Sequence, residues 1–243
     1  MTIEPNERVK MIFLIKRREG SSRDELIMQW YKNHMPAVIA SQERAIEQGR
    51  DGASRYIAQL FQSSNKSEMS WDGMAQLWFA EAQTPARTDQ NREPSDTFQQ
   101  KAEPYFSWAT REYVVMDGSE HLSTAPLTLN DPYPSTRSGF FRANYLVPAQ
   151  DGTDYDTFFR HWLEVHVPNI RDWMNQAGGF RYVVSHSIYP ELAPYAGMAE
   201  LYFHSEDDWR KCQSLMRADG MERFVDGGRM DIMYGDTEMV GVP

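Results

Sequence analysis

Apolar and polar positions alternate in some stretches of the chain and recur every three or four residues in others. The run RVKMIFLIKR near the amino terminus alternates and is rich in Ile and Phe, as expected of a β-strand. The next run, GSSRDELIMQWYKNH, has helical spacing, and its Ser22 and Glu25 fit the Ser-x-x-Glu capping box. SRYIAQLF, GMAQLWFA and REYVVMD predict three more strands, with a second helix expected at 96–105 before the last of them.

The same series of elements occurs a second time. WYKNHMP at 30–36 and WLEVHVP at 162–168 share their spacing of Trp, His and Pro, and GMAQLWF at 73–79 matches GMAELYF at 197–203. The distance between equivalent positions falls from 132 (30 to 162) to 124 (73 to 197), so the first copy has longer loops. Matched blocks in one order indicate an internal duplication. In the second copy, the second helix is predicted at 205–216.

The duplication predicts the domain organisation. We expect a first domain at 1–117, a Pro- and Ser-rich linker at 118–138, and a second domain at 139–243. Each domain has the order strand, helix, strand, strand, helix, strand, which is that of a ferredoxin-like α+β fold with helices on one face of its sheet. The two uncovered sheet faces would pack together, which predicts a barrel within one chain and a cavity between the sheets.

Strand alternation assigns side chains to the two faces of each sheet. Gly, Ala, Leu and Phe of GMAQLWF and GMAELYF are identical in the two copies, and we expect them to pack under the helices. The opposite face differs between the copies and mixes aromatic and Met side chains with polar groups. Such a mixture suits a small, mostly apolar ligand, and an ordinary inter-domain core is the alternative. The candidate residues of this face are Lys10, Met74, Gln76, Trp78, Arg142, Asn144, Met198, Glu200 and Tyr202.

Two histidines recur with the repeat. His34 and His166 each follow the Trp of the repeat by four positions, so each is expected on the buried side of its helix. The Pro two positions later predicts that the helix breaks or kinks there. Each imidazole is either a structural hydrogen-bonding group or a general acid/base, since His titrates nearest neutral pH. His186 is a further candidate for substrate binding, because the first copy has Leu60 at that position.

Composition narrows the classes of partner and cofactor. The 243 residues carry a formal net charge of −10, which disfavours nucleic acid and anionic membranes as partners. The single cysteine excludes an intrachain disulfide and a Cys-rich zinc site. With no recognisable signal peptide or membrane-spanning run, a cytoplasmic protein is expected. The chain has no standard metal or nucleotide motif, and we expect neither a metal nor a cofactor. Binding of haem or iron through His34 or His166 is the alternative.

The stretch VKMIFLIKRREGSSRDELIMQWYKNHMPAV resembles the opening of EthD-type domains: a strand ending in Lys/Arg, a turn with Gly, an acidic helix start, then Trp and His-x-Pro. DGMAQLWF resembles the third strand of the family. The second copy, RANYLVPAQDGTDYDTFFRHWLEVHVPNI, lacks the basic turn, since Pro148 and Ala149 stand there. The resemblance implies the dimeric α+β barrel fold in tandem and a catalytic role for His34 or His166.

The resemblance implies several chemistries. EthD-like proteins are associated with the degradation of ethers and aromatics and with polyketide tailoring. The wider superfamily includes cofactor-free monooxygenases, cyclases, lactone isomerases and haem-binding peroxidases and dehydratases. The fold therefore does not select a reaction.

We expect an enzyme that acts without a cofactor on a small aromatic or polyketide-like molecule, by decarboxylation, dehydration or a double-bond shift. One of the repeated histidines would be the base. Arg142 or Lys10 would hold a carboxylate or enolate, and Glu200 or Tyr202 would be the second proton-transferring group. A cofactor-free monooxygenase of phenols and a non-catalytic ligand-binding accessory protein are the alternatives. Two chains could also pair through an exposed helix face, so a homodimer is a further alternative.

Overall fold

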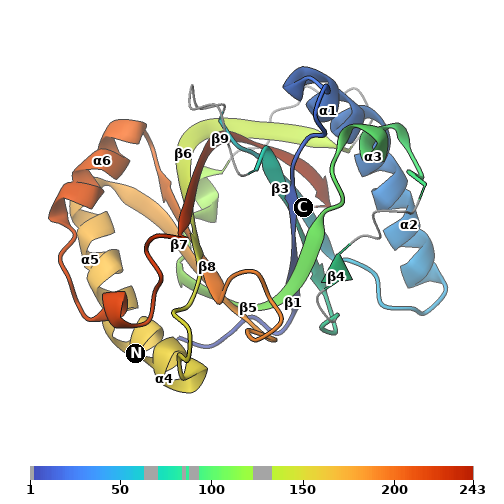
Figure 1. Ribbon diagram of the computed structural model, residues 1–243. Coiled ribbons are helices and arrows are strands. Elements are labelled where there is room, and N and C mark those ends of the chain that lie inside the picture. The colour runs from blue at the N-terminus through green and yellow to red at the C-terminus, as the bar shows by residue number, and fades with distance from the viewer. Residues whose placement is uncertain (1–2, 63–70, 84–85, 88–92, 123–132, 243) are drawn as a thin grey trace. The chain divides into compact units, whose positions relative to one another are not determined.

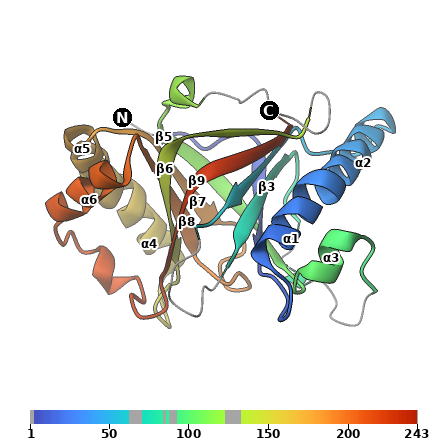
Figure 2. The same ribbon diagram turned by 90° about the horizontal axis from the view of Figure 1, so that it is seen from above.

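The computed structural model describes residues 3–62, 71–83, 86–87, 93–122 and 133–242, which form a mixed α+β fold (Figures 1 and 2). Contacts divide the chain into two compact units. The amino-terminal unit comprises Arg8–Ala109, Ser123–Ser138 and Gly235–Pro243. The carboxy-terminal unit comprises Met1–Glu7, Thr110–Leu122 and Gly139–Tyr234.

The amino-terminal unit contains most of the first copy of the repeat. Its elements are β1 (Val9–Ile15), α1 (Arg23–Gln29), η1 (Trp30–His34), α2 (Met35–Glu47), β2 (Arg55–Leu60), β3 (Gly73–Phe79), β4 (Ala86–Arg87), α3 (Thr97–Lys101) and the start of β5 (Phe106–Met116). β3 lies between β1 and β2 and pairs antiparallel with both. β5 lies beside β1, and β4 pairs with the first residues of β5. The helices lie on one face of this sheet (Figure 2).

The carboxy-terminal unit contains most of the second copy. Its elements are η2 (Ser119–His121), β6 (Ser135–Val147), α4 (Tyr155–His161), η3 (Trp162–His166), α5 (Val167–Ala177), β7 (Gly179–Ser187), β8 (Gly197–Phe203), α6 (Glu206–Leu215), η4 (Met221–Arg223) and the start of β9 (Asp231–Val242). β8 lies between β6 and β7, again antiparallel, and β9 lies beside β6. α5 and α6 lie side by side on one face of the sheet (Figures 1 and 2). β6 already begins within the predicted linker.

Three long strands carry the chain between the units: β5, β9 and β6, whose first four residues belong to the amino-terminal unit. β5 lies beside β1 at its start, whereas its residues from Thr110 onward pair antiparallel with β7. β9 begins in the carboxy-terminal unit, and its residues from Thr237 onward pair with β2. The predicted closing strand of the first copy therefore also pairs with a strand of the second, because β5 has 11 residues and is long enough for two partners. The domain and linker boundaries inferred from the duplication, 1–117, 118–138 and 139–243, remain a prediction.

The predicted sheet faces are confirmed at the glycines that open β3 and β8. A side chain at Gly73 would lie 3.0 Å from the Trp30 ring and 2.6 Å from a backbone oxygen of β2. At Gly197 it would lie 3.1 Å from the Trp162 ring. Glycine thus lets the repeated Trp lie directly against its sheet, on the face that carries the identical Ala, Leu and Phe positions. This is the face predicted to pack under the helices.

Neither helix breaks at its Pro, although the helical backbone is irregular just before it. In both copies the helix continues, and a five-residue π-helical turn, η1 or η3, precedes α2 or α5. Met35 N–H donates to Trp30 O, and Val167 N–H donates to Trp162 O, five residues back in each case. A proline has no N–H and its ring clashes with the carbonyl four residues earlier. The wider π turn accommodates this, because its bonds skip one residue more than in an α-helix.

The predicted capping box is confirmed, since Ser22 and Glu25 form both of its bonds at α1. Ser205 caps α6, at the predicted start of that helix. The helix expected at 96–105 is only Thr97–Lys101, capped by Asp96. The nearby Pro104 disfavours helical backbone in the residue before it, which is consistent with the early end. Within the described part of the chain, no helix combines the length and apolar character needed to span a membrane.

Candidate active site

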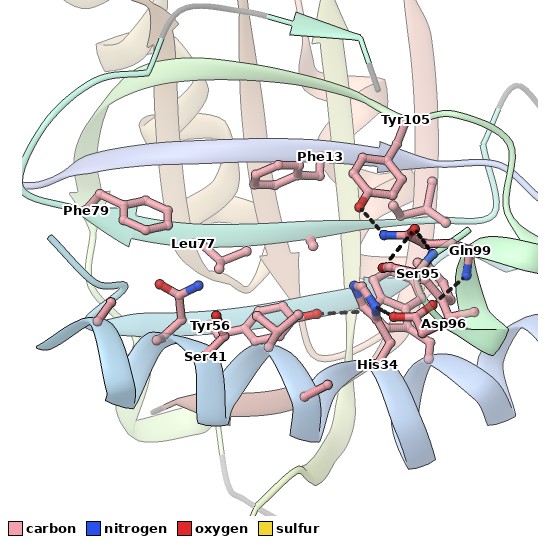
Figure 3. A pocket seen from close by; sticks show the side chains of 18 of the residues that line it. Phe13, His34, Ser41, Tyr56, Leu77, Phe79, Ser95, Asp96, Gln99 and Tyr105 are labelled. Atoms are coloured by element: carbon pink, nitrogen blue, oxygen red, sulfur yellow. Dashed lines mark hydrogen bonds and ion pairs between the residues drawn. The ribbon is translucent and has the colours of Figure 1, made fainter. Parts of the chain in front are cut away.

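A cavity of about 520 Å³ lies in the amino-terminal unit, between α2 and the helix-facing side of the sheet (Figure 3). Phe13 of β1 and Leu77 and Phe79 of β3 contribute its sheet wall. His34 and Asp96 point toward each other at one end, and Phe79 lies toward the other (Figure 3). The residues that alternation had placed under the helices therefore line a cavity there.

The repeated histidine of this unit is paired with a carboxylate. His34 Nδ1 lies 2.6 Å from Asp96 Oδ2. The other carboxylate oxygen of Asp96 accepts from Gln99 N at 2.8 Å as the cap of α3, so the helix start fixes the carboxylate. The His34 ring also stacks on Phe98, with 4.4 Å between centroids. Backbone and packing together hold this imidazole in one orientation.

A second cavity, of about 460 Å³, lies at the equivalent place in the carboxy-terminal unit. Its sheet wall includes Tyr145 of β6 and Leu201 of β8, and its helix side includes Trp162 and His166. Apolar side chains dominate the remaining wall, among them Ile170, Met216, Met221, Val225 and Met230. Among the described residues that line it, Glu222 is the only Asp, Glu, Lys or Arg.

His166 repeats the histidine–carboxylate arrangement. Its Nδ1 lies 2.9 Å from Asp219 Oδ2, and Asn169 Nδ2 donates to the same oxygen at 3.1 Å. Met221 N donates to the other oxygen at 3.2 Å. The side chain of Asp219 is 9% exposed. Three donors thus hold this carboxylate beside the imidazole.

The electrostatics of the pair favour a neutral imidazole and an ionised carboxylate. Burial lowers the pKa of His166 below the usual 6.5, and the neighbouring Asp219 only partly offsets this. Burial alone would raise the pKa of Asp219, but Asn169, His166 and the Met221 N–H together lower it below its usual value. A carboxylate only accepts, so His166 donates from Nδ1 and its Nε2 carries the lone pair. This is the protonation state of a general base.

Four of the predicted site residues lie together in the sheet of the carboxy-terminal unit. Arg142 forms a buried ion pair with Glu200 and donates to Asn144 Oδ1 at 2.9 Å. Asn144 Nδ2 donates to the Met233 carbonyl at 3.0 Å, and the Arg142 guanidinium lies 4.9 Å from the Tyr202 ring centroid. The predicted polar face is therefore a buried hydrogen-bonded cluster within this unit.

The remaining predicted residues lie in the two sheets and are buried. In the amino-terminal unit, Lys10 Nζ lies 5.4 Å from the Trp78 ring centroid, and Lys10 is opposite Trp78 in the register of β1 and β3. Outside the two histidines, none of the predicted site residues lines either of the two cavities in the described part of the chain. The buried residues in question are Lys10, Met74, Gln76, Trp78, Met198 and His186.

His186 lies behind the wall of the carboxy-terminal cavity. Its ring stacks on Phe159 with 4.2 Å between centroids and lies 4.9 Å from Trp162, which lines the cavity. The residue is 3% exposed, and its Nε2 has no partner among the described residues. Burial, and to a lesser extent the charge of Arg111, lowers its pKa to about 3. His186 is therefore a neutral ring packed between aromatic side chains.

The two carboxylates were missed at the level of sequence. Asp96 and Asp219 are 123 positions apart, which lies between the offset of 124 at the third strands and that of 118 from Phe106 to Phe224. The sequence signal for this pair is therefore an acidic residue at equivalent places in the two copies, ahead of the last strand. It was hard to recognise because the surrounding residues differ between the copies. No group of three or more potential metal ligands occurs in the described residues.

Comparison with known proteins gives a partial match. Residues 150–228 match the model of the EthD domain, and this segment includes both His166 and Asp219. The chain resembles an anthrone oxidase-like protein of known structure with a TM-score of 0.50 and 9% identity, covering 100% of this chain and 98% of that one. This shows a shared fold. No curated protein matches the chain.

Two other solved structures are less similar. One is a heme-binding protein from Thermus thermophilus, with a TM-score of 0.46 and 11% identity over 97% of this chain and 93% of that one. The other is a chlorite dismutase from Candidatus Nitrospira defluvii in complex with imidazole, with a TM-score of 0.43 and 8% identity over 94% and 91%. Scores below 0.5 support no conclusion about this chain.

Proposed function

We propose that the protein is an enzyme that moves a proton on a small aromatic or polyketide-like substrate, and that the carboxy-terminal cavity is its active site. The reaction is of the lyase or isomerase type: decarboxylation, dehydration or a double-bond shift. The observation that carries the proposal is the His166–Asp219 pair at the wall of a largely apolar cavity. An apolar cavity with few polar groups is the usual form of a small-molecule site.

His166 would be the general base of this reaction. Its Nε2 takes a proton from a C–H or O–H bond of the substrate, and the imidazolium so formed is stabilised by Asp219 through Nδ1. The bond electrons stay on the substrate as an enolate or phenolate. Return of the proton to another atom completes an isomerisation. The surrounding apolar wall strengthens the electrostatic interaction of the pair, because little water screens it.

Two observations favour the carboxy-terminal cavity over the amino-terminal one. The EthD match falls on residues 150–228. In addition, His166 has a pKa lowered by burial, which keeps it in the base form at neutral pH. His34 and Asp96 form the runner-up site, in a cavity with more polar residues at its wall, including Arg50 and Asp51.

We further propose that the two copies are tandem ferredoxin-like domains arranged as a dimeric α+β barrel within the chain. The strand orders β5-β1-β3-β2 and β9-β6-β8-β7 support this, since each is the order of a split β-α-β sheet. The roles predicted for Lys10, Arg142, Glu200 and Tyr202 remain predictions, as do a homodimer and a cytoplasmic location.

The proposal needs no cofactor, and the donor set of the carboxy-terminal cavity fits haem poorly. His166 could be an axial ligand, but the described lining offers no Arg or Lys for the anionic propionates and includes Glu222. An absorbance spectrum and metal analysis of the purified protein check this directly. A Soret or flavin band, or stoichiometric iron, would overturn the proposal of a cofactor-free enzyme.

Proton transfer can be tested before the product is identified. The protein is incubated in D₂O with enolisable aryl ketones and phenols, and deuterium incorporation is followed by NMR. We expect exchange that is lost in His166→Ala and kept in His34→Ala. Exchange that survives both changes, or no exchange with any compound of the panel, overturns the proposal. Saturable binding without exchange would instead favour a non-catalytic carrier.

A second candidate is a cofactor-free monooxygenase of phenolic substrates. The aromatic wall of the cavity, with Tyr145, Trp162 and Tyr182, suits an electron-rich ring. The solved anthrone oxidase-like protein shares the fold. Both candidate reactions begin with removal of a proton by the same base, so oxygen consumption in the exchange samples separates them. Stoichiometric uptake of oxygen would replace the lyase or isomerase assignment.

A further inference from the structure

The two cavities differ at an equivalent pair of aromatic side chains. In the amino-terminal unit, Trp30 Nε1 donates to Tyr56 Oη at 3.0 Å, and both residues are 1% exposed. Trp162 and Tyr182 hold the same places in the carboxy-terminal unit and are 1% and 0% exposed. There, Trp162 Nε1 and Tyr182 Oη have no hydrogen-bond partner among the described residues. The duplicated positions have thus kept their residue types, and the Trp162 indole is still close enough to lower the pKa of the phenol slightly, but the two groups no longer meet in hydrogen-bond geometry.

Two unpartnered donors beside one cavity are unusual, because buried polar groups are almost always hydrogen-bonded. Both Trp162 and Tyr182 line the cavity that also contains His166. Burial raises the pKa of Tyr182, and the Trp162 indole only partly offsets this, so the phenol keeps its proton. An indole N–H can only donate, and a protonated phenol can donate as well. A ligand atom that satisfies both groups is therefore an acceptor.

The charge of the lining limits the ligand further. The described residues around this cavity include Glu222 and no Arg or Lys. An anionic ligand would meet a carboxylate and find no cation to pair with, at a cost that grows in an apolar cavity. The acceptor is then most favourably an oxygen of a neutral molecule.

We infer that Trp162 and Tyr182 form a subsite for the carbonyl or phenol oxygen of a neutral, largely apolar ligand. The subsite indicates which class of substrate the proposed active site would bind. Its role in catalysis rests on the proposed function. When His166 removes a proton from the carbon next to such a carbonyl, the C–H electrons move to form an enolate. Trp162 Nε1–H and Tyr182 Oη–H would hydrogen-bond its oxygen, and the proton stays on His166 until it returns to carbon.

Binding to three matched probes tests the subsite: 1-tetralone, tetralin, which lacks the oxygen, and 1-naphthoate, which is anionic. Affinities are measured by ligand-detected NMR titration on the whole chain. We expect 1-tetralone to bind about tenfold more tightly than tetralin, as for one hydrogen-bonded group, and 1-naphthoate to bind weakest. Tyr182→Phe should remove most of the preference for the ketone and leave tetralin unchanged.

Tyr56→Phe is the matched control, since it removes the equivalent hydroxyl from the other unit. It should leave the preference for the ketone unchanged. The ¹³C carbonyl resonance of bound 1-tetralone supplies a second readout, because hydrogen bonding shifts it downfield, and Tyr182→Phe should reverse part of that shift. No measurable ketone binding, equal affinity for ketone and hydrocarbon, or a preference that survives Tyr182→Phe each overturns the subsite.

Failure of the subsite and failure of the proposed function give different results. If ketone binding depends on Tyr182 but no deuterium exchange occurs, the subsite stands and the catalytic proposal fails. If exchange depends on His166 while Tyr182→Phe changes neither affinity nor carbonyl shift, catalysis stands and the subsite fails.

Discussion

The two cavities of this chain have the same construction and different chemistry. Each lies between a helical run with a π turn and the helix-facing side of a sheet, and each has a histidine bonded to a carboxylate through Nδ1. In the amino-terminal cavity the Trp and Tyr are hydrogen-bonded to each other, and the wall has polar residues. In the carboxy-terminal cavity the equivalent Trp and Tyr have no hydrogen-bond partner among the described residues, and the wall is mostly apolar. The duplication thus keeps a histidine–carboxylate pair at each cavity, whereas the residues of the cavity wall differ between the units.

The difference predicts that only one carboxylate matters for proton transfer. Asp219→Asn should lower the rate of deuterium exchange about 10²-fold or more, because the imidazolium loses its negative partner and its tautomer is no longer fixed. Asp96→Asn, the same change in the other unit, should alter the rate less than tenfold. Equal losses in both variants would mean that the cavities act together, and the comparison would then have to be abandoned.

His186 gives the carboxy-terminal unit a pH dependence that the first copy, with Leu60, lacks. Its pKa in the folded protein is about 3, below the unfolded value near 6.5. The unfolded chain therefore binds the proton first as the pH falls. This contribution to stability is complete above about pH 6.5 and is lost below it at about 1.4 kcal/mol per pH unit.

His186→Leu installs the residue of the first copy. The free energy of unfolding, measured with urea between pH 7 and 5, should fall less steeply in this variant than in the parent protein. Part of the slope should remain, since the pKa of His166 is lowered as well. Identical slopes in parent and variant would show that His186 is already protonated, or accessible to water, in the folded chain.

The Trp–Tyr pairs predict opposite effects on stability. Tyr56→Phe leaves the buried Trp30 N–H without its acceptor and should cost about 1–3 kcal/mol. Tyr182→Phe removes a hydroxyl that has no partner among the described residues, so the free energy of unfolding should change by less than about 0.5 kcal/mol or rise. Urea denaturation of the two variants under one set of conditions measures both. A large loss in Tyr182→Phe would reveal a partner for that hydroxyl.

The duplication made much of this comparison accessible from the sequence. Strand alternation, checked between two copies, placed the Gly-Ala-Leu-Phe face under the helices, and helical spacing placed His34 and His166 on the buried side. The ligand cavity predicted on the opposite face, from the polar residues there, stays a prediction. In the structure, Arg142 pairs with Glu200 and donates to Asn144. Hydrogen-bond pairing of this kind leaves no periodic signal.

The sequence predicts a break or kink at each Pro but not the form that the irregularity takes. A proline excludes an ordinary α-helical turn, but the sequence does not reveal that a π turn replaces it. Asp96 and Asp219 were missed because they are 62 and 53 positions away from their histidines in the sequence. Only the fold brings each carboxylate next to its imidazole. Local patterns determine faces and helix starts, whereas pairing across loops has to be observed.

The smallest expected effect concerns the ionisation of His166 itself. Asp219 raises the pKa of this imidazole against the stronger lowering by burial, so Asp219→Asn should lower it further, by less than about one pH unit. The ring proton resonances of His166, identified by their loss in His166→Ala, should titrate below pH 6.5 in the parent protein and lower still in Asp219→Asn. Because the neutral ring is the proposed base, kcat/KM should fall as the pH drops through the same value. A titration that moves upward in Asp219→Asn would mean that the carboxylate is protonated in the folded chain, and the base would then lack the ionised partner on which its assignment depends.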